Sequence, residues 1–279
     1  MSEIELIEEL RDKPRVKVGP DGFVVYVDHM GSDKRVCDAA RVSYSPKQKH
    51  SDDRTLLRYL MRHRHTTPFE QCKITLYVRV PMDTWRQWVR HRMASINEVS
   101  TRYQEAIDAT AIPAENEWRI QSKKNKQGSE GTLSAEEGAI HTVRFMKAAE
   151  ACRHAYQMAR KSDVAREEAR AILPLCTYTE AYWTIDLHNL MHFLQLRMAP
   201  DAQLEIRDYA HAIRDLVYPL FPETLDAFEA YRLRSLTLTL FDITAIQTQD
   251  WTGSKFGDKR ERQEYLDKLQ RLMLGPYGR

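Results

Sequence analysis

The run Lys73-Ile74-Thr75-Leu76-Tyr77-Val78-Arg79-Val80 places an aliphatic side chain at every second position. Successive side chains of a strand point to opposite faces of a sheet, so this run predicts a β-strand with one buried face. Pro81 ends the strand, because proline is well suited to the start of a helix. Trp85, Trp88 and Val89 recur at helical spacing and predict that a helix follows directly.

Regular patterns also precede this strand. Residues 16–18 and 23–27 flank Pro20-Asp21-Gly22, an arrangement that predicts a β-hairpin. Farther along the chain, Ser51 can cap a helix whose apolar residues share one face. Those apolar residues are Leu56, Leu57, Leu60 and Met61.

The segment after the predicted helix is less regular. Residues 104–133 lack periodicity, and residues 121–131 within them predict a flexible polar loop. Ser134 and Glu137 form a capping-box pattern that opens a long helix, and Asp163 can cap the helix after it. The apolar side of the long helix is predicted to consist of Ile140, Val143, Ala151, Ala155 and Met158.

The C-terminal part contains patterns of both kinds. Residues 175–185, rich in Tyr, Thr and Trp, predict a strand, and residues 235–240, where leucines alternate with polar side chains, predict a late strand. Helices are predicted over 187–197, 201–217, 222–232 and 258–274. The mixture indicates an α+β fold, with a mainly antiparallel sheet packed with long helices. We expect a single domain over residues 1–232 and a C-terminal extension of unknown role over 233–279.

Composition excludes several classes of protein. The chain has neither a G-x-G-x-x-G motif nor a Walker-type loop, so no Rossmann-type dinucleotide-binding domain is expected. Its 42 basic and 40 acidic side chains nearly cancel and create no overall field for nucleic acid. The four cysteines form no C-x-x-C pair, and no apolar run approaches ~18 residues. We therefore expect a cytoplasmic protein with reduced thiols that binds neither membranes nor nucleic acid.

Residues 90–103 hold the densest polar cluster of the chain. These fourteen positions contain three arginines, a histidine, a carboxylate, an amide and two serines. Such a segment is either a solvated, salt-bridged surface or a binding site, because charged groups are rarely buried without partners. We expect the preceding helix to end near Arg92, so that side chains and backbone N–H groups can converge in a turn. Guanidinium groups suit phosphate oxygens, which indicates an anionic, phosphorylated ligand.

Several blocks of this sequence are similar to those of a known family. Arg90-His91-Arg92, seven residues and then Ser100 resemble the signature of the flavin-dependent thymidylate synthases. Further blocks resemble family segments and occur in the family's order, over roughly residues 16–230. They are Ala40-Arg41-Val42-Ser43-Tyr44, His65-Thr66-Thr67-Pro68-Phe69-Glu70, Arg170-Ala171-Ile172-Leu173-Pro174-Leu175, and Trp183 to Leu190 continuing to Arg197.

The resemblance implies two sets of ligand-binding residues. The flavin pocket would be lined by Ser43, His65, Thr67, Glu70, Arg90, His91, Arg92, Asn97, Glu98, Asp186, Leu187, His188 and His192. The nucleotide would be bound by Gln87, Trp88, Val89, Arg90, Glu98, Val99, Ser100, Thr101, Arg102, Arg170 and Arg197. Arg197 is the expected catalytic residue, since a fixed cation at the uracil base stabilises negative charge as it develops.

The resemblance also implies the reaction. It is the methylation of dUMP to dTMP, with methylenetetrahydrofolate as carbon donor, FAD as hydride carrier and NADPH as reductant. The family is homotetrameric, with active sites built from several chains. Neither Cys176, in an apolar setting, nor Ser100, with no histidine–acid pair predicted beside it, is expected to be a nucleophile.

Two other functions remain open from the residues alone. His188 and His192 are four residues apart on a predicted helix, and with Asp186 they could form a metal-dependent hydrolase site. The pair lacks the intervening glutamate of the metalloprotease pattern, and no metal is expected. Residues 90–102 with the basic loop 123–126 could instead form a non-enzymatic nucleotide- or RNA-binding site, against which the near-neutral charge counts.

Overall fold

The computed structural model describes residue 10 and residues 12–43, 51–123 and 127–274. The chain divides into two compact units, Met1–Leu225 and Asp226–Arg279. Among the described residues, no helix has both the length and the apolar character that crossing a bilayer requires.

A five-stranded antiparallel sheet organises the first unit. Its strands, in spatial order, are β1 Arg15–Val18, β2 Gly22–Met30, β3 Lys73–Pro81, β7 Tyr178–Asp186 and β4 Ala94–Glu98. The predicted hairpin, the central strand and the strand near 175–185 are confirmed, and so is the α+β class. The short strand β4 was not predicted.

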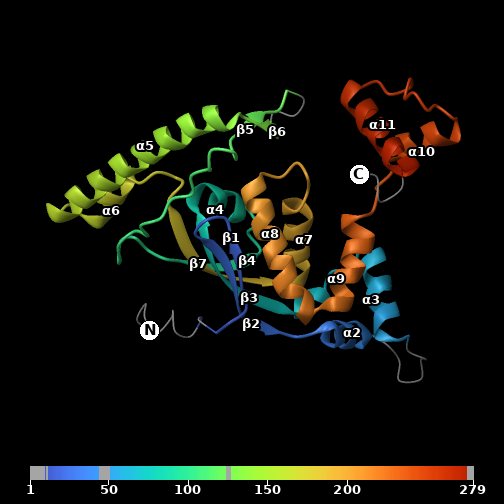
Figure 1. Ribbon diagram of the computed structural model, residues 1–279. Coiled ribbons are helices and arrows are strands. Elements are labelled where there is room, and N and C mark those ends of the chain that lie inside the picture. The colour runs from blue at the N-terminus through green and yellow to red at the C-terminus, as the bar shows by residue number, and fades with distance from the viewer. Residues whose placement is uncertain (1–9, 11, 44–50, 124–126, 275–279) are drawn as a thin grey trace. The chain divides into compact units, whose positions relative to one another are not determined.

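One face of the sheet carries the main core. Leu76 lies opposite Trp183 in the register between β3 and β7, and both side chains are fully buried. Helices α4 Met82–Trp88, α7 Leu187–Arg197 and α8 Leu204–Val217 lie over this face (Figure 1). The ring of Trp88 packs against Trp183, Phe193 and Tyr209, with centroids 5.1 to 5.7 Å apart. This aromatic cluster fixes α4 and α7 on the sheet.

The opposite face is not simply solvated. Tyr77 is only 5 % exposed, and its hydroxyl donates to Glu180 at 2.6 Å. Arg79 pairs with the same carboxylate at 2.5 Å. Burial and the hydrogen bond to Glu180 together raise the pKa of Tyr77 well above its usual range. The prediction that β3 buries only one face is therefore too simple.

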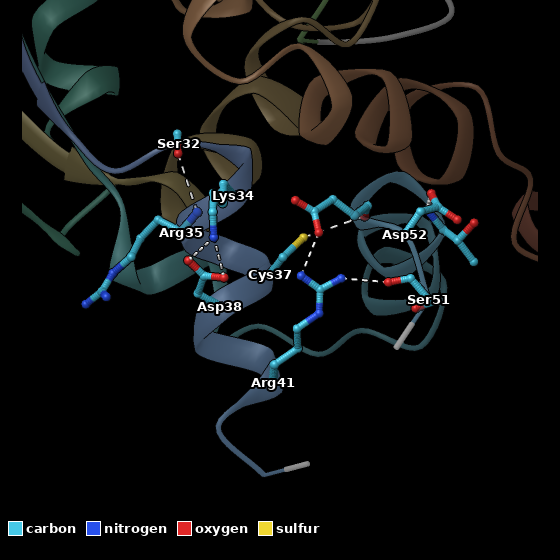
Figure 2. A network of polar contacts seen from close by, with 10 residues as sticks. Ser32, Lys34, Arg35, Cys37, Asp38, Arg41, Ser51 and Asp52 are labelled. Atoms are coloured by element: carbon cyan, nitrogen blue, oxygen red, sulfur yellow. Dashed lines mark hydrogen bonds and ion pairs between the residues drawn. The ribbon is translucent and has the colours of Figure 1, made fainter. Parts of the chain in front are cut away.

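Two short helices, α2 Asp33–Arg41 and α3 Asp53–Arg62, are joined by a polar network (Figure 2). Arg41 donates to the Asp53 carboxylate at 2.6 Å and to the backbone carbonyl of Ser51 at 2.7 Å. The predicted apolar face of α3 is buried, but its cap is Asp52, whose side chain accepts from Thr55 N–H. The prediction of Ser51 as the cap is wrong by one residue, since the helix begins one residue later.

The long helix α5, Ala135–Lys161, begins with the predicted capping box. Its predicted apolar side is exposed in the single chain, with Ile140 52 %, Val143 49 % and Met158 47 % accessible. The side chains of Ala149 and Tyr156 are buried instead. The helix was predicted correctly, but the prediction of which of its faces packs against the rest of the chain was wrong.

The segments beside α5 differ from prediction in detail. Part of the expected polar loop forms a small hairpin from β5 Arg119–Gln121 and β6 Ser129–Thr132, while its residues 124–126 lie outside the described part of the chain. Asp163 caps no helix, because it adopts a left-handed conformation with φ 55°. Ala165 precedes the short helix α6, Arg166–Ala169, and a 3₁₀ turn follows over Arg170–Ile172.

The later elements cross into the second unit. Helix α9 spans Pro222–Phe228 and is followed by a π-helical turn, Glu229–Leu233, where a single helix over 222–232 was predicted. The predicted strand over 235–240 is wrong, because Thr239 forms a capping box with Asp242 and opens helix α10, Leu240–Gln247. The predicted last helix is confirmed as α11, Lys259–Leu274. Lys268 pairs with the buried Asp242 at 2.6 Å and joins α11 to α10.

Candidate active site

The signature segment is an edge strand with a turn at each end. Helix α4 ends at Trp88, four residues before the predicted end, since Arg90 N–H and His91 N–H turn back to the carbonyls of Gln87 and Trp88. The chain then extends as β4 and pairs with β7. Because side chains alternate across a strand, Asn97 lies on the face opposite to Glu98. The signature therefore does not form one convergent turn.

A cavity of 660 Å³ lies where the end of α4, the start of β4 and the second half of α7 meet. Three arginines and two histidines give it a cationic lining. The lining residues are Arg90, His91, Arg92, Met93, Ile185, Asn189, His192, Leu196 and Arg197. Asn189 was not among the predicted site residues, and the face of α7 that it shares with His192 and Leu196 is the only sequence signal for it.

Arg197 is held by two acceptors from the segment around α4. Its Nε–H donates to Nε2 of His91 at 2.9 Å, and Nη2 donates to the backbone carbonyl of Gln87 at 3.2 Å. In a regular helix Arg197 does not share a side of α7 with His188 or His192. The ring of His91 lies 5.9 Å from that of His192 and also accepts the hydrogen bond from Arg197. Arg197 and His192 are therefore both next to His91.

His91 is neutral in this setting. Burial first, then the neighbouring charges of Arg197 and His192, lower the pKa of His91 to about 4. Burial also lowers the pKa of Arg197, although an arginine stays protonated. Of the three arginines that line the cavity, Arg197 is thus the one whose guanidinium is hydrogen-bonded to a neutral imidazole.

The three residues just before the signature, Gln87, Trp88 and Val89, differ in burial and in their contacts. Trp88 is fully buried in the aromatic cluster, so only its backbone can reach a ligand. Val89 caps α4 and is partly buried. The side chain of Gln87 donates to Gln203, which precedes α8. Gln203 was not predicted as a site residue, and nothing in its local sequence indicates the contact.

A second cationic group lies at the far end of β4. Arg170 donates to the Thr101 hydroxyl at 3.2 Å, and Arg102 pairs with Glu167 at 3.0 Å. Ser100 accepts from Arg102 N–H at 3.3 Å, in the turn that follows the strand. The arginines are exposed. The structure brings Ser100, Thr101, Arg102 and Arg170 of the predicted nucleotide-binding residues together here, whereas Arg90 and Gln87 lie at the other end of β4.

Glu98 has a defined role within the chain. It accepts from the indole Nε1 of Trp85 at 2.9 Å and from the Thr179 hydroxyl at 2.7 Å. Val99 N–H continues the pairing by donating to the Glu180 carbonyl at 2.9 Å. The carboxylate therefore ties the edge strand to α4 and β7.

Several predicted flavin contacts lie at the sheet end where β7 enters α7. Leu187 N–H donates to the Cys72 carbonyl at 2.9 Å, which brings the segment 65–70 beside the start of α7. Asp186 caps α7 by accepting from Asn189 N–H and from its side-chain amide, at 2.9 and 2.7 Å. Ala94, at the start of β4, pairs with Ile185 at this same end.

The side chains of this group are mostly accessible. His65 lies 5.8 Å from the ring of Tyr59 and 6.4 Å from that of His63. Ser43 and Thr67 are exposed, whereas Glu70 and His188 are partly buried. Among the residues described, no group of three or more possible ligands is arranged to hold a metal ion.

The fold and these groups define an α+β protein with a cationic group of side chains at each end of an edge strand. A family model described as thymidylate synthase complementing protein matches residues 26–223. Flavin-dependent thymidylate synthases from Gluconobacter oxydans and Thermus thermophilus are each 46 % identical to the chain. The alignments cover 78 % of this chain and 73 % of the first relative, and 81 % and 82 % for the second.

The chain is also similar to a solved structure. The UMP/dUMP methylase PolB from Streptomyces cacaoi, bound with 5-Br dUMP, superposes with a TM-score of 0.70 at 35 % identity. The match covers 78 % of this chain and 99 % of that chain. The chain belongs to the family of flavin-dependent thymidylate synthases, and it is an enzyme.

Proposed function

We propose that this enzyme methylates dUMP to dTMP, with methylenetetrahydrofolate as carbon donor, FAD as hydride carrier and NADPH as reductant. The observation that carries the proposal is how the guanidinium group of Arg197 is held at the cavity. Two protein acceptors hold its guanidinium beside a cationic cavity, and within the described part of the chain its Nη1 has no hydrogen-bond partner. A preorganised cation of this kind suits a base on which negative charge develops.

Arg197 would act electrostatically on the uracil. Carbon 5 of uracil must become nucleophilic to attack the one-carbon unit, and it does so when negative charge develops on the ring at N3 and the carbonyl oxygens. Arginine hydrogen bonds at the N3 and carbonyl edge stabilise that charge without giving up a proton. Partial burial strengthens the interaction, because fewer water molecules screen it.

The phosphate would bind at the other end of β4. The turn after β4 offers the guanidinium group of Arg102 and the hydroxyls of Ser100 and Thr101, and Arg170 adds a second guanidinium group from the 3₁₀ turn after α6. The pair between Arg102 and Glu167 is 55 % exposed on both sides, and such pairs contribute little free energy. A dianionic phosphate can therefore replace Glu167 as the partner of Arg102.

The residues at the cavity end fit a flavin. Arg90 and Arg92 are exposed cations suited to a pyrophosphate, and the neutral ring of His91 can approach a planar ring without adding charge. His192 lines the same cavity. When bound, FAD would carry hydride from NADPH to the one-carbon unit. The further residues that we assign to this pocket are Ser43, His65, Thr67, Glu70, Asn97, Asp186, Leu187 and His188.

We further propose a homotetramer with active sites shared between chains. Four residue steps along β4 cover roughly 13 Å, before the turns that carry His91 and Thr101 are added. A single nucleotide would have to span more than this to reach Arg197 and Arg170 of one chain. The exposed apolar residues of α5 support association, because isolated proteins rarely expose so many large apolar side chains on one helix. The four free thiols support a cytoplasmic location.

The test is production of dTMP by the purified enzyme. Protein reconstituted with FAD is incubated with dUMP, NADPH and methylenetetrahydrofolate, and each component is omitted in turn. We expect dTMP only in the complete mixture, together with a visible flavin absorption band. UMP replaces dUMP in a parallel reaction, which measures whether the ribose 2′-hydroxyl is accepted. A colourless protein that makes no dTMP after FAD is added would overturn the proposal.

A further inference from the structure

The Arg197–His91 contact restricts the protonation of the imidazole. An arginine has five N–H donors and no acceptor, so the His91 nitrogen that meets Arg197 Nε must carry a lone pair. His91 therefore has its proton on Nδ1. The groups that surround it favour this neutral form: burial and the charges of Arg197 and His192 lower its pKa to about 4. Arg90 and Arg92 also line the cavity, and within the described residues no carboxylate does.

The position of the imidazole is set by the core. Its ring packs against Phe193 with centroids 4.9 Å apart, in an edge-on arrangement. Phe193 is fully buried and contacts Trp88 and Trp183 at 5.1 and 5.0 Å. The acceptor offered to Arg197 is thus anchored to the aromatic cluster that holds α4 and α7 on the sheet.

Without its two acceptors, the Arg197 side chain would not be restricted to this orientation. Its side chain has many rotamers, and it lies in the last turn of α7, where the following chain turns away. The His91 ring and the Gln87 carbonyl take its Nε–H and one Nη2 hydrogen. The remaining N–H groups, two on Nη1 and one on Nη2, are left for a ligand.

We propose that His91 is a positioning residue that acts through Arg197: its neutral ring holds the guanidinium in the orientation used on the substrate base. This inference rests on the proposed role of Arg197. According to this inference, His91 increases the rate of methyl transfer, and this role is separate from any contact with the flavin. The protein sets the direction of the guanidinium before substrate arrives, so the transition state does not have to order it.

Two variants of His91 and one control distinguish the effect of its hydrogen-bond acceptor from the effect of its aromatic ring. His91→Phe keeps an aromatic ring against Phe193 but removes the acceptor. His91→Gln can place its side-chain oxygen near the former Nε2 and so restores an acceptor. His211→Phe, at an exposed histidine of α8, is the control. We expect methyl transfer in a single turnover to fall on the order of 10–10²-fold in His91→Phe and much less in His91→Gln. His211→Phe should keep the wild-type rate.

A double-mutant cycle tests whether His91 acts through Arg197. If it does, His91→Phe should slow the Arg197→Lys enzyme by far less than it slows wild type, because the two positions serve one interaction. Bound flavin is measured for every variant, so a rate change from cofactor loss is recognised. An equal slowing in both backgrounds would overturn the proposal, and so would a wild-type rate in His91→Phe.

One measurement does not depend on turnover. The Arg197 Nε–H signal in a ¹H–¹⁵N spectrum, identified by its loss in Arg197→Lys, should exchange slowly with solvent in ligand-free enzyme. It should exchange rapidly in His91→Phe and slowly in His91→Gln. Rapid exchange in the wild type would overturn the positioning role. Slow exchange in a protein that makes no dTMP would instead contradict the proposed function and leave the positioning contact in place.

Discussion

Trp85 donates its indole N–H to Glu98 at 2.9 Å, and this bond joins the helix before the signature to the strand inside it. Thr179 supplies a second donor to the same carboxylate, at 2.7 Å. The acidic residue of the signature is thus part of the framework that fixes β4 on the sheet. The carboxylate still has lone pairs for a ribose or flavin hydroxyl.

We predict that Glu98→Gln destabilises the protein. A glutamine can accept from only one of the two donors well, and its amide group then faces the other. The free energy of unfolding should fall by about 1–3 kcal/mol, the cost of a poorly satisfied hydrogen-bonding group. Urea unfolding measures the change. Glu167→Gln, which removes an exposed pair with Arg102, should cost less than ~1 kcal/mol and is the matched control.

Arg197→Lys should separate redox chemistry from methyl transfer. Lysine keeps the charge but loses the planar fork, so FAD binding and reduction by NADPH should be normal. Methyl transfer should fall roughly 10²–10³-fold, as on loss of one preorganised donor in other enzymes. Single-turnover oxidation of reduced flavin with dUMP and folate present is the measurement. A wild-type rate would leave Arg197 as a structural cation.

Arg170→Lys should behave differently. A phosphate contact is made in both the ground and the transition state, so its loss raises the dUMP concentration needed without a matching loss in maximal rate. Steady-state rates over a range of dUMP concentrations give the two parameters. A fall in maximal rate at saturating dUMP, with the half-saturating concentration unchanged, would argue against a phosphate role.

Mixing these two variants tests whether sites are shared between chains. The mixture is assayed at a dUMP concentration too low for Arg170→Lys sites to turn over well. If one site takes Arg170 from one chain and Arg197 from another, co-refolded Arg170→Lys and Arg197→Lys chains should restore roughly one site in four. Each variant refolded alone is the control. If each chain supplied a whole site, every site in the mixture would still carry one of the substitutions, and activity would not recover.

The exposed side of α5 should control assembly. Replacing Ile140 and Val143 by glutamate places two charges on a surface that we expect to be buried between chains. We predict dissociation to smaller species with retained secondary structure, measured by light scattering and circular dichroism. The matched control is replacement of Leu240 and Phe241, exposed apolar residues of α10, in the same way. An unchanged mass for the α5 variant would exclude this helix from the interface.

His91 should make stability depend on pH. Its pKa is about 4 in the folded chain, against an ordinary value of 6.5, so between these pH values the unfolded chain binds a proton that the folded chain does not. The free energy of unfolding should therefore rise with pH through this window and fall as pH drops toward 4. Urea unfolding at pH 5 and 7 should show a smaller difference for His91→Gln than for wild type. His211→Gln should keep the wild-type difference.

The sequence alone determined the elements whose signals are local. The alternation in 73–80, the stop at Pro81, the capping box at Ser134 and the helix over 187–197 each lie within a few neighbouring residues, and all are confirmed. The same reasoning named Arg197 and His91 as site residues, through the resemblance of their blocks to family segments. Their contact was not predicted, because 106 residues separate them along the chain.

Only the tertiary structure decided the rest. The segment 94–98 alternates only over Ala94 to Asn97, which is too short to distinguish a strand from a turn, and it is extended because β7 offers it a free edge. The segment 235–240 alternates as a strand should, yet Thr239 caps a helix there instead. Side-chain pattern records which residues avoid water, whereas strand formation also needs a hydrogen-bonding partner. The chain supplies that partner only after distant segments have folded together.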